Sequence, residues 1–247
     1  MTRRPPLERT RDVVDLERRL FLRRGLSLGA LTLLTGCDIT NDDAVQKVLH
    51  AMSRWNDRVQ AALFNPDRLA PTYPESAISR PFRFNAFYEA EQAPKVDGES
   101  WRLELSGLID SKQPWSLREL TALPQQTHIT KHICIEGWSV IGKYTGVPLR
   151  DFLARVGADT TARYVGFKCA DGYWGSLDMA SARHPQTQLT LAFDDETLPP
   201  RFGYPVRVRV PTKLGFKSPK HIVALFVTNE HPGGYWESRG YNWFSGL

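Results

Sequence analysis

The sequence has 247 residues, with 32 Lys and Arg against 27 Asp and Glu and a formal net charge of +5. Residues 1–36 hold 8 of the basic and 4 of the acidic residues, so the remainder carries 24 basic and 23 acidic residues. A nearly neutral remainder has no overall field that attracts a polyanion, which argues against nucleic acid as a partner. The three cysteines lack paired spacing, which excludes a disulfide framework and a structural zinc site.

The first 37 residues have the features of an export signal. Arg18 and Arg19 precede a short apolar run that ends in Leu-Thr-Gly-Cys at residues 34–37. The arginine pair resembles a twin-arginine signal, and Leu-Thr-Gly-Cys resembles a bacterial lipobox. The apolar run between them is shorter than the roughly 20 apolar residues that span a membrane. We expect residues 1–36 to be a signal segment and Cys37 to carry a lipid, which makes the protein a membrane-anchored periplasmic lipoprotein. The alternative is an uncleaved helix in which Cys37 is buried.

Residues 37–81 are predicted to form an amphipathic helix and a proline-rich connection. The helix is expected over residues 42–64, where apolar residues recur at spacings of three and four. The stripe consists of Val45, Val48, Leu49, Met52, Trp55, Val59 and Leu63. We expect this stripe to pack against the rest of the protein, and the alternative is a partner or a membrane surface.

Residues 82–247 are predicted to form one catalytic domain of the α+β class, with mixed β-sheets and short helices. The expected elements are strands over residues 101–105, 205–211 and 221–228 and a helix over residues 148–156. In the second strand three valines alternate with Arg207 and Arg209, so the strand would bury one face and project both guanidinium groups from the other. The third strand is apolar at almost every position, which predicts cover on both faces.

Cys134 is the cysteine whose surroundings indicate chemistry. It ends a β-rich run and precedes a Gly-Trp turn at residues 137–138. A thiol there can point from a rigid strand into a cavity, and a bound high-valent metal would hold it as a thiolate. The residues alone also permit a buried structural cysteine, or a nucleophile activated by a histidine at position 128, 132, 184 or 221.

Six short motifs follow one another between residues 82 and 228. They are Asn85-Ala-Phe-Tyr88-Glu89, Cys134-Ile-Glu-Gly-Trp138-Ser, His184-Pro, Leu198-Pro-Pro, Gly203-Tyr-Pro-Val-Arg207 and Lys213-Leu-Gly-Phe-Lys217-Ser-Pro-Lys220. With these motifs the chain resembles the molybdopterin-binding domain of the sulfite-oxidase superfamily, and within it the catalytic subunits of periplasmic methionine-sulfoxide reductases. The resemblance implies the sulfite-oxidase-type molybdopterin-binding fold and a Mo-molybdopterin cofactor.

The resemblance also implies roles for individual residues. Cys134 would be the catalytic residue and the protein ligand to molybdenum, and Arg207 would contact the cofactor from its strand. The pterin would be lined by Asn85, Tyr88 and Glu89, and the phosphate end would be met by Ser218, Pro219 and Lys220. This agrees with the residues themselves, because Arg207, Lys213, Lys217 and Lys220 form the densest cationic stretch outside the leader.

Two positions of the implied cofactor site depart from the reductase pattern. Cys169 stands where we expect a threonine, and Phe202 stands where we expect a cofactor-contacting asparagine. The second difference removes a hydrogen-bond donor, so the cofactor would sit differently or the pocket would accept another substrate. A disulfide between Cys169 and Cys134 is the alternative that would abolish metal binding.

The implied reaction is oxygen-atom transfer in the cell envelope, with reduction of a small or protein-bound S-oxide or N-oxide as the main expectation. The chain has no haem-attachment or iron–sulfur motif, so electrons would pass through an external carrier such as a membrane haem protein or a periplasmic cytochrome. The first alternative is sulfite oxidation, for which Arg183, Arg201, Arg209 or Arg239 would supply a cationic pocket. The others are a non-catalytic lipoprotein binding module and a cysteine hydrolase.

Overall fold

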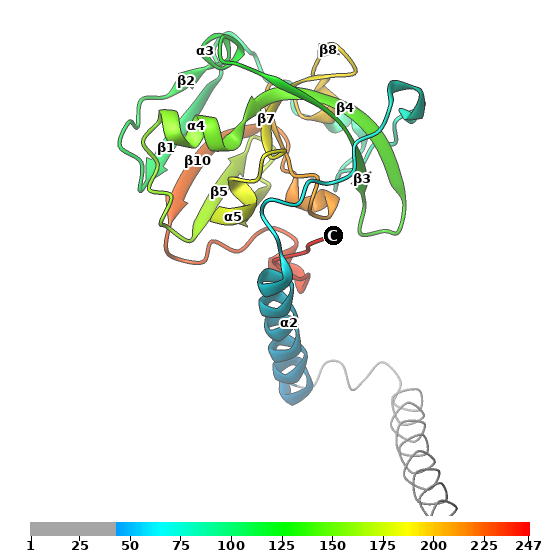
Figure 1. The fold of residues 1–247 in the computed structure, drawn as a ribbon, viewed down its shortest axis with the longest axis vertical. Helices are drawn as coiled ribbons and strands as arrows, with labels where there is room; N and C mark the ends of the chain where they lie inside the picture. The colour runs from blue at the N-terminus through cyan, green and yellow to red at the C-terminus, as the bar shows by residue number, and fades with distance from the viewer. Residues whose placement is uncertain (1–42) are drawn as a thin grey trace, which may run out of the picture. The chain divides into compact units, whose positions relative to one another are not determined.

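The computed structural model describes residues 43–247 (Figure 1). The predicted signal segment, with Arg18, Arg19 and Cys37, lies outside the described residues. Residues 53–247 form one compact unit. No helix within the described range is long and apolar enough to cross a membrane.

The first sheet has five strands in the order β2-β1-β10-β5-β6. Their bounds are β1 (Arg102–Gly107), β2 (Trp115–Ser116), β5 (Tyr164–Cys169), β6 (Trp174–Asp178) and β10 (Ile222–Thr228). β1 and β10 are parallel, and the other neighbours are antiparallel. The prediction that the strand at 221–228 is covered on both faces is only partly right, because Leu225 and Val227 are buried while Val223 and Phe226 are half-buried.

The second sheet is wholly antiparallel and carries the motif with Cys134 at one of its turns. Its order is β3-β4-β7-β8, and β9 pairs with β7. The bounds are β3 (Gln126–Ile133), β4 (Ser139–Pro148), β7 (Gln188–Phe193), β8 (Glu196–Thr197) and β9 (Arg207–Arg209). Figure 1 shows β3 and β4 as a long curved hairpin. The two sheets together confirm the α+β class with mixed sheets.

Short helices connect the strands. They are α3 (Leu117–Thr121), α4 (Leu149–Arg155) and α5 (Met179–Ala182). α4 confirms the helix predicted to open at a proline, since Pro148 is its N-cap. Ser116 caps α3 by accepting a hydrogen bond from the backbone N of Glu119, and the Glu119 carboxylate accepts one from the backbone N of Ser116.

One hydrophobic core joins the two sheets. Leu103 and Phe167 from the first sheet, Leu189 and Val208 from the second, and Phe152 of α4 are fully buried in the same cluster. Alternation along each strand places these side chains on inward faces, so the hydrophobic effect holds the sheets against each other. The strand predicted around residues 205–211 exists, and Val208 and both arginines are buried.

The amphipathic helix predicted over 42–64 is present as α2 (Asp43–Leu63), but its apolar stripe is not a packing face. Trp55 is 65% exposed and Leu63 is 78% exposed. The contact with the domain is made instead by polar groups of Ser53, Asp57 and Gln60. The expected packing of the stripe is therefore wrong.

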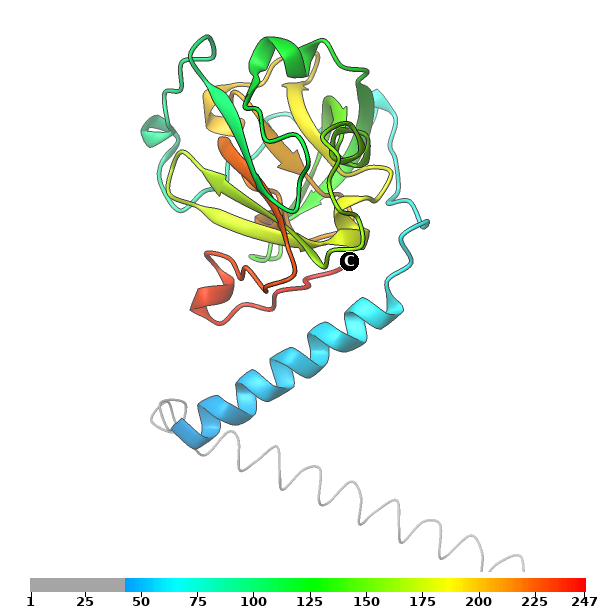
Figure 2. The same cartoon turned by 90° about the vertical axis from the view of Figure 1, so that its left-hand side faces the viewer.

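The C-terminal segment, residues 242–247, ties the last turns of α2 to the domain (Figure 2). Asp57 accepts hydrogen bonds from the backbone N of Trp243 at 3.2 Å and of Phe244 at 2.8 Å, and from Nδ2 of Asn242 at 3.3 Å. Gln60 Oε1 accepts from the backbone N of Gly246 at 2.9 Å. Backbone donors of the segment are thus satisfied by side chains of the helix.

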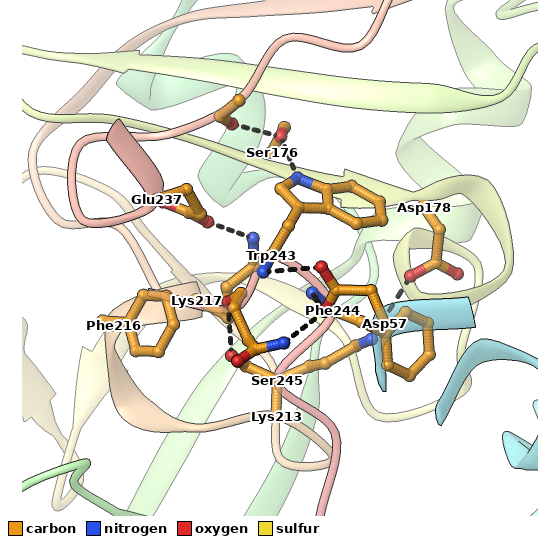
Figure 3. Close-up of polar contacts among 12 residues, drawn as sticks. Asp57, Ser176, Asp178, Lys213, Phe216, Lys217, Glu237, Trp243, Phe244 and Ser245 are labelled. Atoms are coloured by element: carbon orange, nitrogen blue, oxygen red, sulfur yellow. Dashed lines mark hydrogen bonds and ion pairs between the residues drawn. The ribbon is translucent and has the colours of Figure 1, made fainter. Parts of the chain in front are cut away.

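Two buried lysines lie beneath this segment (Figure 3). Lys213 forms an ion pair with Asp178 at 3.3 Å, and its Nζ lies 2.9 Å from the centroid of the Phe244 ring. Lys217 pairs with Glu237 at 2.6 Å. Both side chains therefore belong to the structural contact between the C-terminal segment and the domain.

We expect Asp57→Ala to destabilise the protein. The change leaves the backbone donors of Trp243 and Phe244 without their acceptor, and the loss of charge-assisted hydrogen bonds costs about 2 kcal/mol or more. Urea unfolding measures the effect, with Asp43→Ala at the exposed first turn of the same helix as the control. Equal midpoints for the two variants would contradict the role of Asp57.

Candidate active site

The turn between β3 and β4 holds Cys134 in a fixed position. The backbone N of Cys134 donates to the carbonyl of Trp138 at 2.9 Å, and the backbone N of Gly137 donates to the carbonyl of Cys134 at 3.1 Å. Gly137 has φ of 88°, a left-handed conformation that favours glycine. The Cys134 side chain is buried at 8% exposure. The Gly-Trp turn thus presents the thiol from a rigid hairpin.

The surroundings of the Cys134 sulfur are mixed. Burial raises the pKa of the thiol above its usual range, while the backbone N–H groups of Glu136 and Ile135 and the charge of Arg83 lower it. The Glu136 carboxylate adds to the increase. Two backbone donors at the sulfur are suited to a thiolate, which a bound metal would stabilise against the effect of burial.

A cavity opens beside this thiol. Six of the predicted site residues line it, namely Asn85, Tyr88, Cys134, Ser218, Pro219 and Lys220. They come from segments that are up to 135 residues apart, as the hydrogen bond from Lys220 Nζ to the Asn85 carbonyl shows. The fold therefore brings the three principal motifs of the sequence to one hollow.

Three buried cations lie in and behind this site without an ion pair to any residue of 43–247. Arg207 and Arg209 are 2% and 1% exposed, and Lys220 is 9% exposed. Their hydrogen bonds go to neutral oxygens, such as the carbonyl of Phe202 for Arg207 and the carbonyl of Lys131 for Arg209. Aromatic rings offset part of the cost of burying these charges, and an anionic ligand would offset more of it.

Several buried nitrogens of these arginines and of the neighbouring His132 also lack a hydrogen-bond partner in the described part of the chain. They are Nε of Arg207, Nε of Arg209 and both ring nitrogens of His132. Burial and the positive charges of Arg209, Arg207 and Lys220 hold the pKa of His132 well below its usual range. A neutral imidazole retains one donor and one acceptor for a ligand.

These features fit Mo-molybdopterin. A single thiol can supply one metal ligand at the wall of a cavity, and the unpaired cations and orphaned donors suit a phosphate and a polar ring system. No cluster of three or more His, Cys, Asp or Glu side chains that could hold a metal occurs in residues 43–247. Cys134 would therefore share a metal with ligands brought by the cofactor.

Four predicted site residues do not line the cavity, and their roles stay predictions: Glu89, Cys169, Phe202 and the buried Arg207 described above. Glu89 is exposed and caps the 3-10 turn Ala90–Gln92. Cys169 is a free thiol in the main core, and burial raises its pKa strongly. Phe202 packs in an aromatic cluster with Tyr144 and Phe193, and its carbonyl accepts from Arg207 Nη1 at 3.0 Å.

Sequence reasoning missed Asp171 and Tyr173, which also line the cavity. Asp171 Oδ2 accepts a hydrogen bond from the Tyr88 hydroxyl at 3.1 Å, and Asp171 Oδ1 accepts from the backbone N of Tyr173 at 3.0 Å. The signal available was Asp171-Gly172 between two β-rich runs, which is typical of a tight hairpin turn. Only the fold places that turn beside Tyr88.

Comparison with known proteins identifies the class. The family model described as "Oxidoreductase molybdopterin binding domain" matches residues 90–236, more than half of the chain. The chain is 61% identical over 229 residues to the putative protein-methionine-sulfoxide reductase subunit YedZ1 of Azospira oryzae, and the match covers 93% of this chain and 87% of that protein. It is 32% identical over 177 residues to the protein-methionine-sulfoxide reductase catalytic subunit MsrP of Ralstonia nicotianae, covering 62% of this chain and 54% of that protein.

A solved structure agrees on the fold. The sulfane dehydrogenase SoxCD of Paracoccus pantotrophus superposes with a TM-score of 0.53 at 21% identity, covering 56% of this chain and 40% of that chain. The chain belongs to the molybdopterin-binding oxidoreductase family. It is a molybdenum-dependent oxidoreductase with Mo-molybdopterin as its cofactor, which confirms the expected fold and favours an enzyme over a binding module or a cysteine hydrolase.

We expect the cofactor-free protein to gain stability between pH 7 and pH 9. Burial lowers the pKa of Lys220 and of Lys213 to about 7, so the folded protein releases protons that the unfolded chain keeps up to pH 10 or so. Stability therefore rises with pH, by up to about 1.4 kcal/mol per pH unit for each lysine. Urea unfolding at pH 7, 8 and 9 measures the slope.

The matched variants for this pH experiment are Lys220→Met and Lys112→Met. Lys220→Met should reduce the slope by about half, because Lys213 remains, whereas Lys112 is exposed and its replacement should leave the slope as it is. A profile that is flat or falls in the unsubstituted protein would show that these buried lysines stay charged. Above pH 9 the buried thiol of Cys169 acts in the opposite direction, because it ionises only in the unfolded chain.

Proposed function

We propose that this enzyme reduces S-oxides, with N-oxides as related substrates, by oxygen-atom transfer in the periplasm. The observation that carries the proposal is the cavity in which the Cys134 thiol, a protonated phenol and two carboxylates meet. The two curated relatives described above are named as protein-methionine-sulfoxide reductase subunits, which supports the same substrate class.

The charges around the cavity favour a neutral substrate over sulfite. Its lining includes the carboxyl groups of Glu136 and Asp171, while Lys220 directs its Nζ to the carbonyls of Asn85 and Arg201. A dianion would meet two carboxylates there, and like charges disfavour its binding. A neutral sulfoxide carries no such penalty.

The arginines considered for a sulfite pocket support the same choice. Arg183 and Arg201 are exposed, and Arg209 is buried behind the cavity against Thr130. Arg239 lies over the Tyr235 ring at 3.6 Å and donates to the Tyr235 carbonyl at 2.7 Å. The cavity lining includes none of these four side chains.

When bound, the cofactor would supply the two-electron transfer of an oxygen atom. Cys134 would hold the metal, and Arg207 with Lys220 would compensate the negative charge of the cofactor. Asn85, Ser218 and Pro219 would orient its polar groups from the cavity wall. Glu89, Cys169 and Phe202 remain candidate contacts by resemblance alone.

Reduction of a sulfoxide to a sulfide and water consumes two electrons and two protons, so a proton donor is required. Tyr88 lines the cavity, and burial followed by the charge of Asp171 raises the pKa of its hydroxyl. The phenol therefore stays protonated at neutral pH. Its O–H donates to Asp171 Oδ2 at 3.1 Å, and we assign it to deliver its proton to the reacting oxygen by turning away from that acceptor.

The location and partners belong to the same proposal. Residues 1–36 would act as a twin-arginine signal, the lipid on Cys37 would anchor residues 37–81 to the membrane, and residues 82–247 would be the catalytic domain. Electrons would come from a membrane haem protein or a periplasmic cytochrome. Anchoring raises the effective concentration of the enzyme at a membrane partner.

We expect Cys134→Ala to lose bound molybdenum and sulfoxide reduction, because Cys134 is the one thiol of residues 43–247 that lines the cavity. Metal analysis of protein from cells that make the cofactor measures the first effect, and a reduced viologen with a dialkyl sulfoxide measures the second. Cys169→Ala is the matched control and should keep molybdenum. Oxidation of sulfite with no sulfoxide reduction by the unsubstituted enzyme would contradict the proposed direction.

Tyr88→Phe should lower kcat for sulfoxide reduction by about 10² or more and change KM little, since general acid catalysis commonly contributes that factor. Tyr164→Phe serves as the control, because Tyr164 packs against His231 and Trp243 away from the cavity lining. Steady-state kinetics of the two variants, corrected for molybdenum content, make the comparison. An unchanged kcat would remove Tyr88 from the reaction.

A further inference from the structure

Helix α2 uses its polar side for the contact with the domain, which leaves its apolar stripe free. At 100° per residue, Ser53, Asp57 and Gln60 fall on one side of the helix, and these residues contact the C-terminal segment. The stripe is centred on a different side. A surface helix normally does the opposite and buries its apolar side.

The exposed part of the stripe is large. Met52 is 63% exposed, Trp55 65% and Leu63 78%, and the two remaining large residues, Val48 and Leu49, are 59% and 47% exposed. Contiguous exposed apolar residues of this size mark an interaction surface. Trp is the side chain best suited to a boundary that is apolar on one side and wet on the other.

Three cations lie on a third side of α2, which adjoins the Trp55 edge of the stripe and is not the side of the domain contact. Lys47, Arg54 and Arg58 recur at spacings of seven and four, so they project from one side of α2. All three are exposed. An apolar side with Trp, flanked by Lys and Arg, is the pattern of a helix that lies in the plane of a membrane surface.

We propose that α2 lies on the surface of an anionic phospholipid bilayer. Its apolar stripe enters the boundary between headgroups and acyl chains, and Lys47, Arg54 and Arg58 lie against lipid phosphates. Charge favours this occupant over a transmembrane helix of a partner protein, because a lipid phosphate layer can meet all three cations at once.

The predicted lipid supports the same occupant, and this step rests on the proposed anchoring at Cys37. Only five residues lie between Cys37 and Asp43, the first residue of α2. The six steps from Cys37 to Asp43 span about 20 Å at full extension, so the helix would begin close to the membrane surface. The bilayer is then the nearest apolar phase that the stripe can reach.

The experiment uses the full chain loaded with cofactor and carrying Cys37→Ala, so that no lipid is attached. Flotation with vesicles of phosphatidylglycerol and phosphatidylethanolamine measures the fraction bound, and phosphatidylcholine vesicles provide the neutral surface. We expect binding to the anionic vesicles that falls with salt. Adding Met52→Gln and Trp55→Gln should lower the partition coefficient about tenfold or more.

Two further variants make the comparison specific. Lys47→Gln with Arg54→Gln and Arg58→Gln should abolish the preference for anionic vesicles. Leu69→Gln changes a residue that is 56% exposed but lies outside α2, and it should bind as the parent does. Molybdenum content and circular dichroism of each variant show that the fold is retained.

Equal flotation of the parent and the Met52/Trp55 variant would overturn the proposal. So would binding that needs these residues but occurs only with vesicles containing a membrane protein. Either result would leave the proposed sulfoxide reduction untouched, because that reaction is measured on the same loaded protein with a soluble electron donor.

Discussion

The structure depends on positive charge that is buried without a partner. Within residues 43–247, Arg207, Arg209 and Lys220 form no ion pair and donate hydrogen bonds only to neutral oxygens, although each is at least nine-tenths buried. The cost of such an arrangement is several kcal/mol per ion after relaxation, which a small domain could not bear without compensation. At the proposed site the cofactor would therefore be part of the electrostatic balance of the fold as well as the source of its chemistry. Binding of an anion that only the folded chain can hold also stabilises the fold by linkage.

The same chain shows how it treats buried cations that serve structure alone. Lys213 and Lys217 are buried to a similar degree as Arg207, yet each has a carboxylate partner, Asp178 and Glu237. This contrast lies within a few residues of sequence, so it does not reflect a general shortage of acidic groups. The sequence pattern grouped Lys213 and Lys217 with the cofactor, but the structure places them under the C-terminal segment (Figure 3). An unpaired buried cation is therefore a more specific sign of a ligand site than cationic density along the chain.

Local patterns predicted the parts of the site that depend on neighbours in sequence. The end of a strand followed by Gly137 was enough to expect a projecting thiol at Cys134, and alternation was enough to expect two guanidinium groups on one side of β9. Such local patterns could not predict contacts between segments that are distant in the sequence. The hydrogen bond between Tyr88 and Asp171 joins residues 83 positions apart, and Glu89 turned out to cap a turn beside its motif. The side of α2 that contacts the domain could not be predicted either. Hydrogen bonds of polar side chains determine it, whereas the spacing of the apolar residues predicts that the apolar side is buried.

That choice of face follows from the C-terminal segment. A short extended segment presents backbone N–H groups that must be satisfied, and a carboxylate accepts several of them at once. Asp57 does so for Trp243 and Phe244, whereas an apolar face could not. Once the polar side is fixed in this way, the apolar side has to face outward, whatever covers it. The same bonds join the second half of α2 to the domain that holds Cys134, so a surface that binds the stripe would also restrict where the active site can lie. Under the proposed supply of electrons by a membrane protein, such a restriction would raise the effective concentration of the enzyme at that partner, because both would lie at the same membrane surface.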